Sequence, residues 1–148
     1  MKPARIFHIT SAAAAAEGVA SGTFVPAAFA DEGFIHCSYA HQVCDVANRL
    51  FGGRTDLVLL EIDPGRLTCR VIDENLEGGT ELFPHVYGPI PASASVAVHR
   101  FACDRDGRFR LPRGCAGPAR VQATCRRGAA PHRQRFARSG PRRRPESG

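Results

Sequence analysis

The strongest strand signal in the chain is the segment Asp56–Ile62, which reads Asp-Leu-Val-Leu-Leu-Glu-Ile. Its apolar residues follow one another without the polar alternation of a half-exposed strand, so both faces are expected to be buried. A strand of this kind lies in the middle of a sheet. At 148 residues the chain is long enough to build one domain around such a strand.

The segments before this strand alternate between strand and helix signals. Arg5–Ile9 is rich in β-branched and aromatic residues and predicts a first strand. The alanine run that follows predicts a helix, which Thr10 or Ser11 can cap and which should end near Gly18 or Gly22. After a loop over residues 23–30, a second strand and a second helix are expected at Phe34–Cys37 and Tyr39–Phe51, with Ser38 as the helix cap and Gly52-Gly53 as its end.

The segments after the central strand give strand signals only. They are Thr68–Ile72, Glu81–Val86, Ser95–Phe101 and Arg108–Leu111, the last behind a hairpin-type turn at Asp104–Gly107. Helices that come early and strands that come late favour an α+β fold over a doubly wound one. We therefore predict a compact mixed, largely antiparallel sheet with two N-terminal helices.

The charge of the chain divides at Pro112. Residues 1–112 hold 10 Lys and Arg against 13 Asp and Glu, whereas residues 113–148 hold 10 Arg against Glu146 alone. We predict residues 1–112 as a single globular domain and 113–148 as a disordered Arg/Pro/Gly-rich tail. Such a tail would bind nucleic acid by charge alone, and Phe136 is its one aromatic residue for stacking, so no specific nucleic-acid partner is expected.

The cysteines and the N-terminus bear on compartment. None of the 6 cysteines forms a C-x-x-C pair or a zinc-finger spacing. No apolar stretch at the N-terminus has the length of a signal peptide or of a membrane span. We expect a cytoplasmic protein with reduced thiols and no membrane contact; oligomeric state is not readable.

Three histidines lie in strand-like contexts and repeat one pattern. His8 precedes Thr10 by two residues, His36 precedes Ser38, and His85 precedes Tyr87. Residues i and i+2 of a strand share a face, so each pair presents an imidazole with a hydroxyl, a set suited to a ribose or an amide. We predict His8, His36 and His85 as catalytic residues. The predicted ligand-binding residues are Thr10, Ser38, Gln42, Glu81 and Tyr87.

Other interpretations of these residues remain open. Each histidine can be a hydrogen-bonded core residue, and three histidines can hold zinc, although no spacing fixes two of them on one element and no metal is expected. Cys37, beside His36, suggests a thiol nucleophile, yet adjacent strand residues point to opposite faces, so it is expected to pack inside.

The chain resembles the domain of unknown function 952 family in four motifs. They are Phe7–Thr10, Glu32–Ser38 followed by Gln42, Leu59–Asp63, and Leu82–Ile90. That family is similar in fold to the ADP-ribosyltransferase superfamily, a compact split β-sheet domain that cradles NAD. The resemblance implies NAD or ADP-ribose as the ligand, NAD as the substrate of a transferase, and His8 at the NAD ribose. Some members of the family are labelled as related to glutathione S-transferase, but this chain is too short for that two-domain fold.

Two departures from the resemblance define the alternative function. The chain has no tryptophan where the family carries one in its first helix, and His85 stands where transferases of the superfamily use a glutamate. The alternative is a non-catalytic small-ligand-binding module of the same fold. The tail from Arg113 lies outside the resemblance, and its composition fits an out-of-frame readthrough of GC-rich code.

Overall fold

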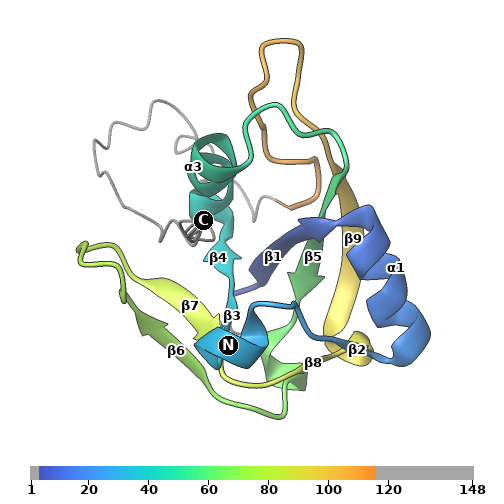
Figure 1. Ribbon diagram of the computed structural model, residues 1–148, viewed down its shortest axis with the longest axis vertical. Helices are drawn as coiled ribbons and strands as arrows, with labels where there is room; N and C mark the ends of the chain where they lie inside the picture. The colour runs from blue at the N-terminus through green and yellow to red at the C-terminus, as the bar shows by residue number, and fades with distance from the viewer. Residues whose placement is uncertain (1–3, 116–148) are drawn as a thin grey trace, which may run out of the picture.

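The computed structural model describes residues 4–115, and the predicted tail beyond Cys115 lies outside the described residues. A four-stranded sheet forms the centre, in the order β4-β1-β5-β9. Figure 1 shows β1, β5 and β9 side by side, with β4 at the edge of β1. All strand pairs of the described residues are antiparallel, so the α+β class and the largely antiparallel sheet are confirmed. The bounds of the four strands are Ile6–Ser11 (β1), Ser38–Tyr39 (β4), Leu57–Ile62 (β5) and Ser95–Phe101 (β9).

Strand β5 lies between β1 and β9 and is buried on both faces, as predicted. Leu57 and Leu59 point into one apolar cluster with Phe7 and Phe101. The alternate residues point into a second cluster on the other face; they are Val58, Leu60 and Ile62. The unbroken apolar run exists because each face of this strand meets its own layer of side chains.

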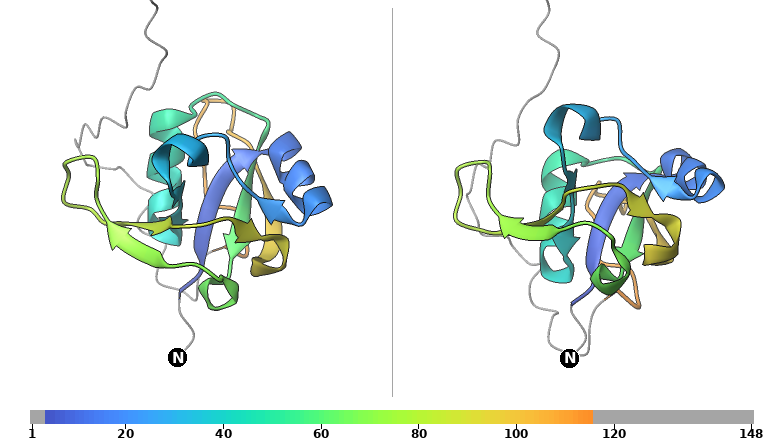
Figure 2. Two further views of the ribbon diagram at one scale, coloured as in Figure 1. Left: turned by 60° about the horizontal axis from the view of Figure 1, so that its bottom comes forward. Right: turned by 90° about the horizontal axis from the view of Figure 1, so that it is seen from below.

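One helix packs on each face of the central sheet (Figures 1 and 2). Helix α1 (Ala12–Ser21) contributes Ala15 to the cluster around Leu60. The Ser11 hydroxyl accepts a hydrogen bond from the Ala14 main chain, and Gly22, with φ +91°, ends the helix in the left-handed region. Both ends were expected from the sequence.

Helix α3 (Ala40–Leu50) covers the opposite face with Val43 and Ala47. Its cap differs from the prediction, because Ser38 is drawn into β4 and Tyr39 takes the cap position. The Tyr39 main-chain N–H donates to the Gln42 side chain at 2.9 Å, which satisfies a donor at the start of the helix. A sheet contact therefore overrides the local capping preference of serine.

A smaller three-stranded sheet lies beside the first, in the order β3-β7-β6. In Figure 2, strands β6 and β7 extend as a ribbon away from the central sheet. The strand predicted at Thr68–Ile72 forms later in the chain, as β6. The bounds are Ile35–His36 (β3), Val71–Glu74 (β6) and Phe83–Val86 (β7), with a separate pair Thr23–Phe24 (β2) and Ile90–Pro91 (β8), a single-turn helix Phe29–Glu32 (α2), and 3-10 turns at Pro64–Arg66 and Ala92–Ala94.

The segment after β9 corrects one prediction. The turn at Asp104–Gly107 forms, with Gly107 at φ +78°, but residues 108–111 make no strand. The main-chain N–H of Phe109 donates instead to the Asn48 side chain at 2.7 Å, and its ring packs on Phe101. A side-chain amide of α3 takes the place of a strand partner.

Cys115, three residues beyond the boundary predicted at Pro112, packs into the cluster under α3. Within residues 4–115, no helix combines the length and the apolar character that crossing a membrane requires.

Candidate functional site

The central and the smaller sheet diverge between Ser38 and Cys37. Ser38 pairs with Phe7 of β1, whereas the Cys37 main-chain N–H donates to the Pro84 oxygen of β7 at 3.1 Å. The chain thus changes its pairing partner within one residue. From His8 onward, β1 has no main-chain partner on the side where β4 pairs with Ile6 and Phe7. The two sheets are therefore split apart at this point.

His8 spans the split with its side chain. Its Nδ1 lies 2.8 Å from the main-chain oxygen of His36, and a carbonyl only accepts, so Nδ1 carries the proton. Burial lowers the pKa of His8 and outweighs the opposing effect of this hydrogen bond. The imidazole is therefore neutral near pH 7, and its Nε2 is an acceptor that bonds to no other residue among 4–115.

Two cavities share His8 and Pro26 in their linings. The smaller, about 190 Å³, lies between β1, β3, α2 and α3 and is mainly apolar. The larger, about 650 Å³, lies on the α1 side, where Thr10 and Leu60 join His8. The linings contain no Lys or Arg from the described residues, whereas Glu32 lines the smaller cavity and Glu17 the larger one, so these cavities do not suit an anionic ligand group.

His36 and Glu32 bring an imidazole–carboxylate pair to the smaller cavity. The Nε2 of His36 lies 3.1 Å from a Glu32 carboxylate oxygen, and both residues line the cavity. Both side chains are about one-third exposed, so solvent reaches the pair. In the sequence Glu32 only begins the motif Glu32–Ser38, and the fold brings its carboxylate to the imidazole of His36, four residues later.

His85 faces His36 across the β3–β7 pair, with ring centroids 5.0 Å apart. Phe34 stacks on His85 at 4.3 Å and contacts the His36 ring edge-on at 4.8 Å. The three rings form one cluster, but His85 is only 3% exposed and lines neither cavity. Phe34 lies between His85 and the smaller cavity.

Glu74 of β6 holds the far side of His85. One carboxylate oxygen accepts from the Tyr87 hydroxyl and lies 3.0 Å from His85 Nδ1. These contacts lower the pKa of Glu74, chiefly through Tyr87, and the same bond raises the pKa of Tyr87. Burial lowers the pKa of His85 despite its carboxylate partner. Glu74 was not among the residues predicted for the site, because in the sequence it lies far from Tyr87 and His85, its partners in the fold.

The remaining predicted site residues divide between cavity and framework. Thr10 lines the larger cavity and Ser38 the smaller one. Gln42 lies elsewhere: its side-chain amide donates to Glu81 at 3.0 Å and to the main-chain oxygen of Leu82 at 2.8 Å. Gln42 and Glu81 thus join the start of α3 to the segment before β7, outside both cavities.

Cys37 also lines the smaller cavity, although its thiol is a poor nucleophile. The side chain is buried in the cluster on the α1 face, and burial raises its pKa far above the ordinary range. A protonated, buried thiol fits the expectation that Cys37 packs inside.

A family model and solved structures are similar to this chain. A family model described as "Protein of unknown function (DUF952)" matches residues 9–98. The crystal structure of protein CC0527 from Caulobacter crescentus is similar, with 32% identity and a TM-score of 0.65 over 72% of this chain and 94% of that one. The solution NMR structure of CC0527 has 32% identity and a TM-score of 0.64, over 72% and 92%. No curated protein matches the chain.

Proposed function

Because this chain belongs to the DUF952 family, whose description assigns no reaction, we propose a function from its own site: it binds NAD or ADP-ribose in the cavities around His8. The fold of the proposal is ADP-ribosyltransferase-like, with the ligand in the split between the two sheets. The NAD-using enzyme is the leading form of this function, and a binding module without chemistry is the second.

The observation that carries the proposal is the neutral imidazole of His8. Its donor is occupied by the His36 main chain, so only the acceptor Nε2 is left for a ligand. An acceptor fixed by a second hydrogen bond is suited to a ribose hydroxyl. Thr10, two residues along the same strand face, adds a hydroxyl that both donates and accepts.

The charge of the cavities decides which part of the ligand they hold. A pyrophosphate needs cations or main-chain donors, and neither lining contains Lys or Arg from residues 4–115. We therefore place the nicotinamide and its ribose inside, with the nicotinamide ring in the smaller, apolar cavity beside Phe34. The pyrophosphate extends into solvent.

Glu32 and His36 supply the groups for chemistry at the ribose. When the bond between C1′ and nicotinamide breaks, both electrons leave on nicotinamide and positive charge develops on the ribose. The Glu32 carboxylate, at the edge of the smaller cavity, is placed to stabilise that charge. Water or an acceptor hydroxyl then attacks C1′ and gives its proton to the His36 imidazole.

The binding-module form has one specific observation in its favour. The late strand β7 offers His85 rather than a glutamate, and His85 is buried behind Phe34 with its Nδ1 held by Glu74. No carboxylate from this strand reaches the cavities. In this form the ligand binds and is not consumed.

A titration of the full chain with nicotinamide riboside, NAD and ADP-ribose, followed by heteronuclear NMR, tests the proposal. We expect saturable shifts at the amides of residues 8–10 and 34–38, and at least tenfold weaker binding by His8→Ala. His41→Ala, which removes an exposed histidine of α3, is the matched control and should bind normally. Equal binding by His8→Ala, or no shift at all, would overturn the proposal. Nicotinamide release in the same sample separates the enzyme from the module.

A further inference from the structure

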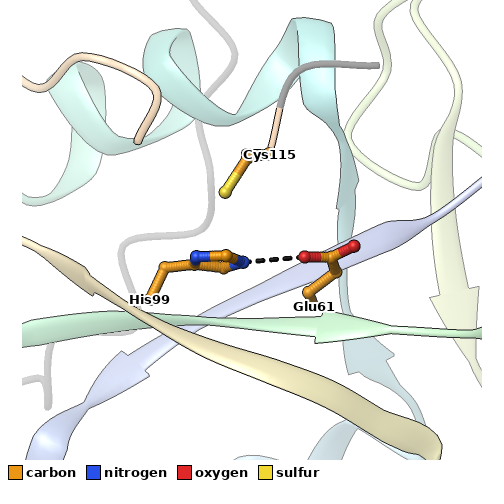
Figure 3. Close-up of side chains that lie close together, drawn as sticks. All are labelled: Glu61, His99 and Cys115. Atoms are coloured by element: carbon orange, nitrogen blue, oxygen red, sulfur yellow. Dashed lines mark hydrogen bonds and ion pairs between the residues drawn. The ribbon is translucent and has the colours of Figure 1, made fainter. Parts of the chain in front are cut away.

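A second cluster of chemically active side chains lies on the other face of the central sheet. Glu61 follows Leu60 in β5, so its side chain points away from the His8 side and toward α3. His99 of β9 is its diagonal neighbour across the strand pair. Cys115, in the segment after β9, points toward Glu61 and His99, as Figure 3 shows.

The three side chains lie within bonding reach of a common centre. One donor atom from each, a carboxylate oxygen, an imidazole nitrogen and the Cys115 sulfur, lies within 4.8 Å of the other two. His99 Nε2 and Glu61 Oε2 are 2.7 Å apart. Cys115 is 5% exposed, and the other two side chains are mostly buried. Three separate segments of the chain thus each contribute one donor atom to a site that is largely shielded from solvent.

From this arrangement we propose that Glu61, His99 and Cys115 bind a divalent zinc ion. Thiolate, imidazole and carboxylate together are ligands of zinc, whereas magnesium and calcium take oxygen ligands. Three protein ligands leave a fourth tetrahedral position for water. Ligand atoms bound to one zinc ion stand somewhat more than 3 Å apart at ordinary bond lengths of about 2.0–2.3 Å, so the Glu61–His99 hydrogen bond opens slightly on binding.

The surroundings support a metal more than a reactive thiol. Neither of the two cavities described above is lined by Cys115. A divalent cation displaces the thiol proton to solvent and balances the negative charge of carboxylate and thiolate together.

Arg5 positions the carboxylate from the opposite side. Its Nε lies 3.8 Å from Glu61 Oε1, and its Nη1 lies 3.1 Å from Asp63. The other oxygen, Oε2, is the one turned toward His99. Glu61 therefore keeps one oxygen for the metal while the second is held by the arginine, the outer-shell arrangement typical of ligating carboxylates.

The test uses the full chain, stripped with a chelator and titrated with Zn²⁺ by calorimetry and with Co²⁺ by absorbance. We expect one metal ion per chain and a sulfur-to-cobalt charge-transfer band. Cys115→Ser should abolish that band, and Cys115→Ser and His99→Gln should each weaken binding at least tenfold. Cys103→Ser, which alters another partly buried thiol beside the same cluster, is the matched control and should change neither readout.

X-ray absorption of the wild-type zinc complex adds a measurement that requires no variant, so its result does not depend on whether a variant folds. One sulfur at about 2.3 Å with nitrogen and oxygen neighbours is expected. A zinc shell without sulfur, or no saturable binding, would overturn the proposal. Unchanged affinity in a folded Cys115→Ser variant would also overturn it, because the metal would then be bound elsewhere. The site lies across the sheet from His8, so these results are independent of NAD binding.

Discussion

The Nδ1 atom of His8 lies 2.8 Å from the main-chain oxygen of His36, and this contact crosses the split between the two sheets. Ser38 pairs with β1, whereas the residues from Cys37 back to Ile35 bond to β7. A side chain thus satisfies a carbonyl where the main-chain ladder ends. The same contact fixes which nitrogen of His8 faces a ligand, so the architecture and the candidate site share one hydrogen bond.

The first prediction concerns pH. The pKa of His8 is lowered in the folded protein, so as the pH falls the unfolded chain binds a proton at this residue before the native state does. The free energy of unfolding should therefore be at its full value above about pH 6.5. It should decrease as the pH falls below that value, by at most about 1.4 kcal/mol per pH unit for each such proton. His85, whose pKa is lowered too, adds to the slope. Urea unfolding at pH 7.5 and 5.5 should show a smaller loss for His8→Gln than for the wild type. An equally steep loss in the variant would contradict this.

The second prediction concerns Glu74, which holds both Tyr87 and His85. Glu74→Gln removes the carboxylate, so the pKa of Tyr87 should fall toward its ordinary value and that of His85 should fall further. Ultraviolet titration of tyrosine and NMR titration of histidine measure the two changes. Asp73→Asn is the matched control, because Asp73 accepts from Tyr39 instead and should leave Tyr87 unaffected. Unchanged titration of Tyr87 in Glu74→Gln would argue against the contact.

The third prediction concerns Gln42, which is 2% exposed and bonds to Tyr39, Glu81 and Leu82. Gln42→Ala removes the partner of the Tyr39 main-chain N–H and of the Leu82 main-chain oxygen, both in part-buried hydrogen bonds, so the free energy of unfolding should fall by about 1–3 kcal/mol. His41→Ala changes the exposed neighbour and should stay within about 0.5 kcal/mol of the wild type. Denaturant unfolding measures both, and equal stability of the two variants would show that Gln42 is not structural.

The fourth prediction concerns Gly18 in α1. In an exposed helix, replacing glycine by alanine stabilises by about 1 kcal/mol. Here a Cβ would lie 2.0 Å from the buried ring of Phe24, so overpacking should reverse the sign and cost about 1–3 kcal/mol. At Gly52 a Cβ meets only one atom, at an ordinary 3.5 Å, which makes Gly52→Ala the control. Thermal unfolding that ranks Gly18→Ala above the wild type would disprove the close packing.

The sequence predicted best where local pattern and burial agree. The central strand Leu57–Ile62 and helix α1 formed where expected, because continuous apolar character and glycine punctuation act within a few residues. Prediction was weaker where a distant partner intervenes. Ser38 joins β1 instead of capping α3, and Phe109 bonds to Asn48 instead of pairing as a strand.

The candidate site shows the same division. The repeated His-x-hydroxyl pattern identified His8 and His36 with Thr10 and Ser38, and all four line the cavities. The catalytic and ligand-binding roles of these residues stay predictions.

What the sequence determined by itself is the α+β class, the central strand and which side chains are available for chemistry, since periodicity and residue type are local properties. Only the tertiary structure decided which of those residues meet. It set His85 behind Phe34, gave it Glu74 as a partner, and brought Cys115 to Glu61 and His99. Such contacts join residues far apart in the chain, and they depend on strand register and on the point where the sheet divides, which no short stretch of sequence encodes.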